Sequence, residues 1–273
     1  LISYLDRGGI YKAIIHLGAN SSTTETNGDL IWKQNILSSI RIWNWCAKNN
    51  TRIIYASSAA TYGNGEYDFL DNESLDYLNA LKPLNLYGWT KAQIDLRIKN
   101  ILINQNLSPP QWIALKFFNV FGPNEYHKEN MSSIILKSYL DIISNRKMTL
   151  FKSHNKAYKD GEQMRDFIYV KDCIKVILWI LSKPKINGIF NCGTGKSRTF
   201  LDIAHSIYST LGKKPNIKFI NTPTNIRDQY QYKTEANTDK LFKAGYTECF
   251  LSIEDSIHDY IINFLNKKYY DIS

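Results

Sequence analysis

A tyrosine and a lysine, Tyr87 and Lys91, are the residues of this chain best suited to proton transfer. They frame the segment Tyr-Gly-Trp-Thr-Lys. Side chains at positions i and i+4 of a helix share a face, so both would point into one cavity. A free phenol has a pKa of about 10 and is a poor base at neutral pH, but a nearby ammonium group favours the phenolate. The pair could therefore shuttle the proton of a substrate hydroxyl.

The spacing Tyr-x-x-x-Lys alone is common by chance and also fits an ordinary helix face. Here it follows a strand-like segment, residues 52–58 (RIIYASS), that ends in two serines. Open α/β sheets bind their ligands at strand ends, so Ser58 could hydrogen-bond the same substrate hydroxyl. The sequence therefore predicts Tyr87, Lys91 and Ser58 as catalytic residues.

Six segments in this order carry a resemblance to a known family. They are residues 14–25 (IIHLGANSSTTE), 53–63 (IIYASSAATYG), 82–91 (KPLNLYGWTK), 117–133 (FFNVFGPNEYHKENMSS), 165–172 (RDFIYVKD) and 189–195 (IFNCGTG). Together they resemble the extended short-chain dehydrogenase/reductases, the NAD-dependent epimerase/dehydratase family, whose members modify nucleotide-sugars.

Within that family the chain is most similar to the ADP-L-glycero-D-manno-heptose 6-epimerases. The similarity rests on SSTTE, on SSAATYG without the Asp-Glu pair of a dehydratase, and on Lys128 after His127. It implies an isomerase of lipopolysaccharide heptose precursor synthesis. NADP, with NAD as the other possibility, would oxidise C6 of the sugar to a 6-keto intermediate and return the hydride to the opposite face.

The resemblance implies that Tyr87 serves one orientation of the sugar and that Lys128 serves the other. Taken alone, Lys128 equally fits a surface lysine or a phosphate contact. It could act as an acid or base only if burial or a neighbouring charge lowered its pKa.

The resemblance also implies two sets of binding residues. The expected cofactor contacts are Leu17, Gly18, Ala19, Asn20, Ser21, Asn35, Ala56, Lys91, Val120 and Lys128. The expected substrate contacts are Ser58, Asn119, Asn130, Lys137, Phe151, Lys152, Ser153, His154, Arg165 and Tyr230. Arg165 would meet the diphosphate, for which its planar guanidinium is well suited.

The sequence departs from the heptose epimerases at the nucleotide end. Phe-Lys-Ser-His at residues 151–154 replaces Phe-Glu-Gly-Ser, and the loop through residues 155–164 is longer. These changes leave open a 4-epimerase acting on a UDP- or CDP-sugar. A non-catalytic NAD(P)-binding homologue is a third hypothesis, which the presence of both Tyr87 and Lys91 opposes.

Composition excludes several other classes. The net charge is +9, but the basic residues are scattered along the chain, so we expect neither nucleic acid nor a membrane as a partner. No apolar run reaches the length of a membrane span, and the first residues lack the pattern of a secretory signal, so a cytoplasmic location is expected. The four cysteines form no CxxC pair and no cluster has metal-ligand spacing, so no metal is expected.

Short apolar segments alternate with amphipathic ones, which is typical of a parallel sheet with helical crossovers. The predicted strands are residues 13–17, 52–56, 112–117, 149–151, 188–192 and 217–220. The predicted helices are residues 28–49, 83–105, 171–181, 199–211 and 253–265.

These elements predict a doubly wound, Rossmann-like α/β fold with a smaller mixed α/β C-terminal substrate lobe. Residues 1–120 would form a truncated NADP-binding domain, and residues 121–273 mainly the substrate lobe, with segments that return to the first domain. The chain lacks the strand, Gly-rich turn and helix that open a dinucleotide-binding fold, so we expect the first strands of the family to be missing. Like its relatives, the protein is expected to be a homo-oligomer.

Overall fold

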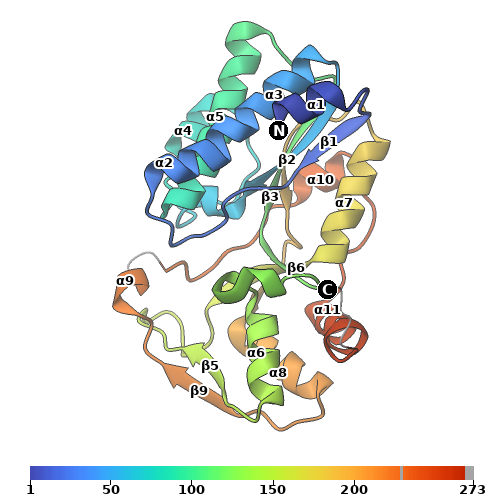
Figure 1. Cartoon of the computed structure of the whole chain (residues 1–273). Helices are drawn as coiled ribbons and strands as arrows, with labels where there is room; N and C mark the ends of the chain where they lie inside the picture. The colour runs from blue at the N-terminus through green and yellow to red at the C-terminus, as the bar shows by residue number, and fades with distance from the viewer. Residues whose placement is uncertain (228–229, 268–273) are drawn as a thin grey trace. The chain divides into compact units, whose positions relative to one another are not determined.

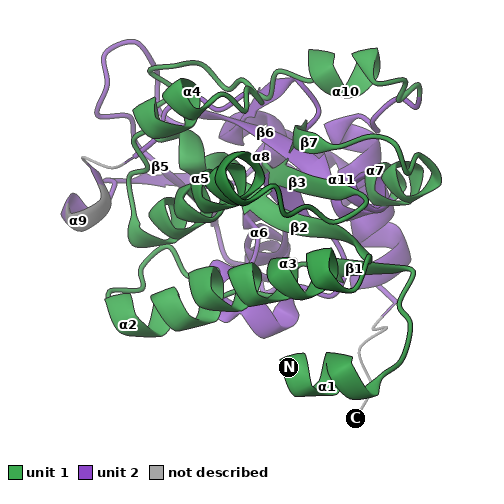
Figure 2. Ribbon diagram, turned by 90° about the horizontal axis from the view of Figure 1, so that it is seen from above, with its two compact units in different colours: residues 1–118, 175–192, 236–247 green, residues 119–174, 193–235, 248–273 purple. Residues whose placement is uncertain are grey.

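The computed structural model describes residues 1–227 and 230–267, and the chain divides into two compact units (Figure 2). Unit 1 contains residues 1–118, 175–192 and 236–247. Unit 2 contains the described residues of 119–174, 193–235 and 248–273. Each unit has its own hydrophobic core.

Unit 1 is built on a four-stranded sheet whose strands pair in parallel in the order β1-β2-β3-β7. Short runs rich in Ile, Leu and Phe form these strands, which are buried in the centre of the sheet and more exposed at β1. The strands are β1 (Ala13–His16), β2 (Arg52–Ser58), β3 (Trp112–Phe117) and β7 (Gly188–Cys192).

Helices cover both faces of this sheet (Figure 1). The α3 and α5 helices pack on β2 and on each other, whereas α10 packs on β7. The helices of unit 1 are α1 (Ile2–Arg7), α2 (Gly28–Ile31), α3 (Ser38–Lys48), α4 (Leu75–Ala80), α5 (Leu86–Gln105), the later part of α7 (Val170–Ser182) and α10 (Asp239–Lys243). A π-helical segment, Trp32–Leu37, joins α2 to α3, and a 3-10 turn, Ala59–Tyr62, follows β2.

Unit 2 contains two small sheets. In one, β4 pairs in parallel with β6, which pairs antiparallel with β8; in the other, β5 and β9 are parallel. The strands are β4 (Asn119–Phe121), β5 (Met148–Phe151), β6 (Met164–Tyr169), β8 (Ser197–Thr199) and β9 (Ile217–Ile220). The helical elements are a 3-10 turn (Tyr126–Met131), α6 (Ile134–Ile143), α8 (Phe200–Thr210), α9 (Thr224–Arg227), α11 (Ile253–Tyr260) and a π-helical end (Ile261–Leu265).

The predicted Rossmann-like parallel sheet is confirmed, and three strands have the predicted bounds. Two helix boundaries follow from capping: Asn85 caps α5, which therefore starts three residues later than predicted, and Thr199 caps α8 through a capping box with Asp202. The uniform helix predicted over residues 28–49 is wrong in detail, because its middle is π-helical. Three strands (β4, β6, β8) and five helices (α1, α4, α6, α9, α10) were not predicted.

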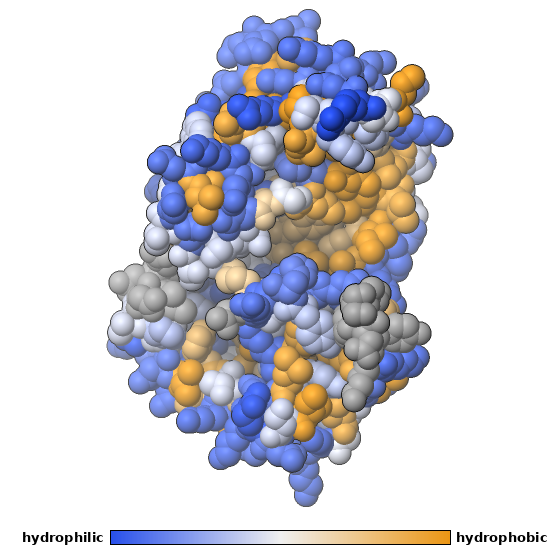
Figure 3. Space-filling model, viewed as in Figure 1, coloured by the Kyte–Doolittle hydropathy of each residue, from blue (hydrophilic) through white to orange (hydrophobic). Residues whose placement is uncertain are grey.

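Apolar side chains also reach the surface of unit 1 near β1, and Figure 3 shows hydrophobic residues gathered on this face. Ile15 of β1 is 43% exposed and Leu17, just after the strand, is 49% exposed. This strand ends the sheet, so one of its edges has no strand partner among the described residues. Within the part of the chain that the structure describes, no helix is long and apolar enough to cross a membrane.

Candidate active site

The start of α5 lies very close to the turn that follows β2. The Asn85 side chain accepts a hydrogen bond from the amide of Gly88 and fixes the first helical turn, which contains Tyr87. A Cβ atom at Gly88 would lie 2.6 Å from the carbonyl oxygen of Ala60. Only glycine therefore allows this approach, which brings the Tyr87 phenol towards Ser58 at the end of β2.

Ser58 is the hydrogen-bonding neighbour of the Tyr87 phenol. Its Oγ accepts a hydrogen bond from the amide of Ala60 at 3.1 Å, and the hydroxyl lies within hydrogen-bonding reach of the phenol. Removal of the phenol from water raises the pKa of Tyr87, and the hydrogen bond from Ser58 lowers it in part. This net direction is opposite to the one expected from a neighbouring ammonium, because burial has the larger effect. The phenol therefore keeps its proton at neutral pH.

Lys91 is held against the strand by a single strong contact. Its side chain is 3% exposed, and Nζ donates a hydrogen bond of 2.7 Å to the carbonyl oxygen of Ala56. The same Nζ lies 5.9 Å from the centre of the Tyr87 ring. Burial lowers the pKa of Lys91 to about 8, against the opposing attraction of the Asp95 carboxylate. Lys91 is thus mostly charged at pH 7, but it loses its proton at lower pH than an ordinary lysine.

Asn35 fixes the loop that follows β1 rather than facing an open space. It is fully buried in the π-helical segment, its Oδ1 accepts from the amide of Asn20 at 2.8 Å, and its Nδ2 donates to the carbonyl of Asn20 at 2.9 Å. Nδ2 also donates to Oγ1 of Thr90, which precedes Lys91. Asn35 therefore links the loop containing the expected cofactor contacts to α5, the helix of Tyr87 and Lys91. The other residues of that loop lie at the surface to different degrees, and Leu17, Gly18 and Ser21 are exposed.

His16, at the end of β1, is kept neutral. Its Nε2 is 2.9 Å from Oγ of Ser39. Burial and, second, the positive charge of Lys91 lower the pKa of His16 to about 4.

In unit 2, Arg165 is a buried cation among aromatic rings. It is 8% exposed, and its guanidinium carbon lies 5.2 Å from the centre of the Tyr230 ring and 5.8 Å from that of Phe200. Burial lowers its pKa. Its Nη1 donates a hydrogen bond of 2.8 Å to the carbonyl oxygen of Met164, and over the described residues no carboxylate forms an ion pair with Arg165.

The stretch of residues 151–154 is tied to the end of β9 and to a tyrosine-rich segment. Phe151 packs edge-on against Tyr230, with ring centres 6.0 Å apart. His154 accepts a hydrogen bond from the amide of Thr222 and donates its own amide hydrogen to the hydroxyl of Tyr232. The Ser153 amide donates to the Asp160 carboxylate at 2.8 Å, and Lys152 is exposed.

Two aromatic residues at this end were not predicted. Tyr158 of the longer loop packs on Tyr232 with ring centres 5.2 Å apart, and Tyr232 packs on Tyr230 at 5.5 Å. The alternating Tyr-Gln-Tyr run at 230–232 was the only sequence signal for this cluster.

The other expected residues of unit 2 are spread over its surface. Lys128 is exposed on the 3-10 turn. The turn is anchored by Glu125, which is 4% exposed and accepts hydrogen bonds from the amide and hydroxyl of Ser133. Asn119 is exposed on β4, Val120 is half-buried, and Lys137 is exposed on α6. The side chain of Asn130 lies outside the described part of the chain.

Among the described residues, no group of three or more His, Cys, Asp and Glu side chains could hold a metal ion. The four cysteines are free thiols, and Cys249 is the exposed one.

Residues 4–193 match the protein family described as the NAD dependent epimerase/dehydratase family. The chain belongs to this family. It is 43% identical over 263 residues to the ADP-L-glycero-D-manno-heptose-6-epimerase of Fusobacterium nucleatum, which covers 94% of this chain and 78% of that protein. The resemblance inferred from the sequence motifs is thereby confirmed.

Solved structures agree on the fold. The ADP-L-glycero-D-manno-heptose-6-epimerase of Helicobacter pylori superposes with a TM-score of 0.75 at 26% identity, over 92% of this chain and 71% of that chain. The UDP-glucose 4-epimerase of Thermus thermophilus, solved with NAD, gives a TM-score of 0.75 at 18% identity, over 95% of this chain and 79% of that chain. At 18% identity, the similarity to the Thermus thermophilus enzyme shows only that the two proteins share a fold.

Proposed function

We propose that this chain is an ADP-L-glycero-D-manno-heptose 6-epimerase of lipopolysaccharide core precursor synthesis. The observation that carries the proposal is 43% identity, over nearly the whole chain, to a protein of that name. The arrangement of Ser58, Tyr87 and Lys91 supports it, because a serine and a phenol in hydrogen-bonding reach, beside a buried amine, suit the reversible oxidation of an alcohol.

Hydride transfer to and from C6 is the chemistry that a bound nicotinamide would supply. Tyr87 exchanges a proton with the C6 hydroxyl, and Ser58 donates a hydrogen bond to the same oxygen. Lys91, when charged, stabilises the phenolate form of Tyr87. The resulting 6-keto sugar turns over before it is reduced on the opposite face, which inverts C6. Lys128 is proposed as the acid or base for that second orientation.

The residues at the carboxyl ends of β1 and β2 fit a dinucleotide. Gly18 is exposed and a Cβ atom there would meet no atom within 4 Å, so a ligand can approach the backbone closely. Asn35 holds this loop in place, and Lys91 and Ala56 lie at the adjacent strand end. Residues 17–21, Ala56, Lys91, Val120 and Lys128 are therefore proposed as cofactor contacts, with NADP as the preferred cofactor over NAD.

Arg165 is proposed to bind the diphosphate, because a buried guanidinium without an anionic partner among the described residues favours a bidentate anion. Tyr230 and residues 151–154 would bind the nucleotide beside it. Asn119, Asn130 and Lys137 remain proposed substrate contacts. The predicted cytoplasmic location stays a prediction.

The two alternatives receive less support. A UDP- or CDP-sugar 4-epimerase was suggested by the altered residues 151–154, but the relative at 43% identity is named for the heptose reaction. A non-catalytic homologue would need neither Tyr87 nor Lys91, and both are present.

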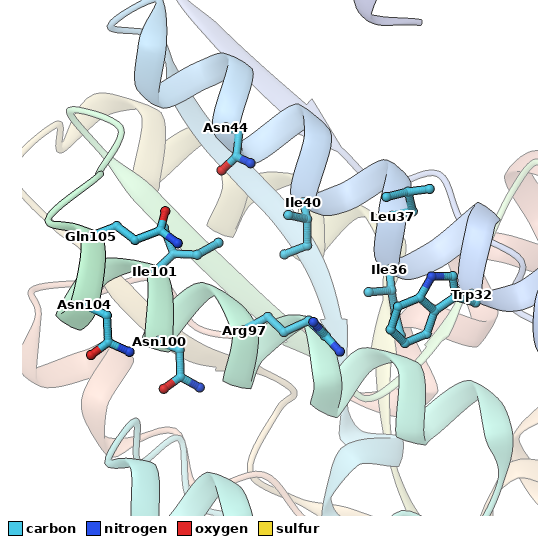
Figure 4. A pocket seen from close by; sticks show the side chains of 10 residues that line it. All are labelled: Trp32, Ile36, Leu37, Ile40, Asn44, Arg97, Asn100, Ile101, Asn104 and Gln105. Carbon is cyan, nitrogen blue, oxygen red and sulfur yellow. The ribbon is translucent and has the colours of Figure 1, made fainter.

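We also propose a homo-oligomer, and one surface of unit 1 suits this role. A groove of about 450 Å³ opens between α5 and the π-helical segment with α3 (Figure 4). Ile36, Ile40 and Ile101 form an apolar floor, and Arg97 lies over the Trp32 ring at its end, 4.9 Å from the ring centre. Light scattering of the protein and of an Ile40→Glu variant tests it; a monomer in both would contradict the proposal.

The function is tested by incubating the protein and NADP with each C6 epimer of ADP-glycero-manno-heptose and following the sugar by NMR. We expect interconversion, and in D₂O we expect hydrogen, not deuterium, at C6, because the hydride returns from the cofactor. Tyr87→Phe is the matched control. Turnover of a UDP- or CDP-sugar without turnover of ADP-heptose would overturn the assignment.

A further inference from the structure

Beneath the catalytic pair lies a second pair of charged side chains that the mechanism above does not use. Asp95 follows Lys91 by one helical turn on α5, and Lys116 lies in β3. They are 1% and 0% exposed, and Nζ of Lys116 is 3.5 Å from Oδ2 of Asp95. Burying two charges is costly unless both gain strong partners, so their partners should explain why they are here.

The carboxylate of Asp95 is held by the strand that holds the catalytic residues. Oδ2 accepts a hydrogen bond of 2.7 Å from the Ser57 hydroxyl, and Oδ1 accepts one of 3.1 Å from the Tyr55 hydroxyl. Ser57 lies between Ala56, which binds Lys91, and Ser58, which faces Tyr87. Three consecutive residues of β2 thus contact three side chains that lie on one face of α5, one helical turn apart.

Lys116 reaches the same strand from the other side. Its Nζ donates a hydrogen bond of 2.8 Å to Oγ1 of Thr61, which in turn donates one of 2.8 Å to the carbonyl oxygen of Ser58. Lys116 therefore supports the backbone of the catalytic serine, while its charge draws on the carboxylate of Asp95.

We propose that Asp95 is a positioning residue that keeps Lys91 charged and pressed against the Ala56 carbonyl, with Lys116 competing for the same carboxylate. The inference rests on the proposed function only for its catalytic consequence. The titratable or charged groups beside Lys91 are His16 from β1 and Tyr87 and Asp95 from α5. Tyr55 from β2 and Lys116 from β3 contact Asp95. Asp95 is the carboxylate in this set, so its charge opposes the effect of burial on Lys91.

The direction of the effect follows from the charges. Burial lowers the pKa of Lys91 to about 8, and Asp95 pulls it upward. Without the carboxylate the pKa falls further, so Lys91 loses its proton near neutral pH and no longer supports the phenolate of Tyr87.

The first experiment needs no substrate. Thermal unfolding at pH 7 is measured for the parent chain, Asp95→Asn, Lys91→Met and the double variant. We expect Asp95→Asn to lower the Tm of the parent chain. In the Lys91→Met background the same substitution should cause a smaller loss of Tm, by at least about 2 °C, because the charge that Asp95 stabilises is gone. Equal losses of Tm in both backgrounds would show that Asp95 serves Lys116 alone, and would overturn the inference.

The second experiment is the pH profile of kcat/KM for heptose epimerisation. Asp95→Asn should move the alkaline limb to lower pH by about one unit. Lys116→Met removes the ion-pair partner of Asp95, so the full charge of this carboxylate can act on Lys91. The alkaline limb should then stay in place or move to higher pH. Asp71→Asn is the matched control: this buried carboxylate accepts the Asn191 amide in the same unit, so its loss should reduce Tm without moving the limb.

The two experiments separate the two proposals. One outcome is that the chain shows unequal losses of Tm in the first experiment and yet does not epimerise ADP-heptose. That result would overturn the proposed function and support the electrostatic interaction between Asp95 and Lys91. In an active chain, an unmoved alkaline limb in Asp95→Asn, or a downward shift in Lys116→Met and Asp71→Asn as well, would overturn the positioning role.

Discussion

The residues proposed for chemistry and those proposed for nucleotide binding are held in different ways. In unit 1, hydrogen bonds fix each functional group to consecutive positions of β2, and Lys91 and Asp95 are almost fully buried. In unit 2, Arg165 lies among rings, and the neighbouring loop is partly exposed. Proton transfer depends on fixed distances, whereas a ring-lined surface can adapt to the group it binds.

The difference teaches where substitutions should act. Changes in unit 1 should alter the rate of the chemical step or the pH dependence. Changes at Arg165 and its aromatic neighbours should alter binding. The following variants test that division, from the largest expected effect to the smallest.

Tyr87→Phe removes the hydroxyl that exchanges a proton and should lower kcat by about a thousandfold. The phenol has Ser58 as its hydrogen-bonding neighbour, so Tm should change little. Turnover by NMR and unfolding by circular dichroism measure the two quantities. A loss of less than tenfold in kcat would place the chemistry elsewhere.

His16 should make unit 1 sensitive to acid. Its folded pKa of about 4 lies below the unfolded value, so the unfolded chain binds more protons between about pH 6.5 and pH 4. Stability contributed by neutral His16 is therefore present above pH 6.5 and lost as pH falls to 4. Between pH 7 and pH 4, the free energy of unfolding of His16→Asn should fall by about 2 to 3 kcal/mol less than that of the parent.

Urea unfolding at both pH values measures this difference, with His205→Asn as an exposed control on α8. If the parent and His16→Asn lose the same free energy, burial does not hold His16 neutral.

Arg165→Met should raise KM for the nucleotide-sugar about ten- to a hundredfold and change kcat less than about threefold, because the contact is made equally in ground and transition states. Arg146→Met, an exposed arginine paired with Asp141 in the same unit, is the matched control. A fall in kcat with unchanged KM would mean that the comparison between the units is wrong.

Tyr158→Ala should have the smallest effect. It removes one ring contact, with Tyr232, worth about 0.5 to 1.5 kcal/mol, so KM should rise by about two- to tenfold. Steady-state kinetics with ADP- and UDP-sugars in parallel would show whether the longer loop affects the choice of nucleotide. Identical kinetics to the parent would show that the loop takes no part in binding.

Much of unit 1 could be predicted from the sequence because its signals are local. Apolar runs of strand length set the bounds of β3 and β7, and the spacing of Tyr87 and Lys91 places both on one helix face. The strands β4, β6 and β8 could not be predicted in this way. β4 and β8 have three residues each, and the six residues of β6 include the charged Arg165 and Asp166, so β6 does not read as a continuous apolar run. What makes these segments strands is their pairing partners in the sheet.

The residues that hold the candidate site in place could not be predicted either, because their contacts are with residues far away in the sequence. Asp95 reads as an ordinary polar position on a helix until Ser57, Tyr55 and Lys116 are seen around it. The role of Asn35 in holding the backbone of Asn20 depends on a π-helical turn, for which the sequence carried no recognisable signal. In both cases the partner lies on another element, and its distance along the chain hides the pairing.

The π-helical segment has a consequence for engineering this protein. A π turn contains one more residue than an α turn, so it acts as an insertion within an otherwise regular helix. Deleting one residue between Asn35 and α3 would give a more regular and intrinsically better helix. It would also rotate Asn35 by about 100° relative to Trp43, which is fixed in the core. Such a shortened protein would gain helical regularity and yet release the backbone of Asn20, so stabilising designs should leave this segment at its present length.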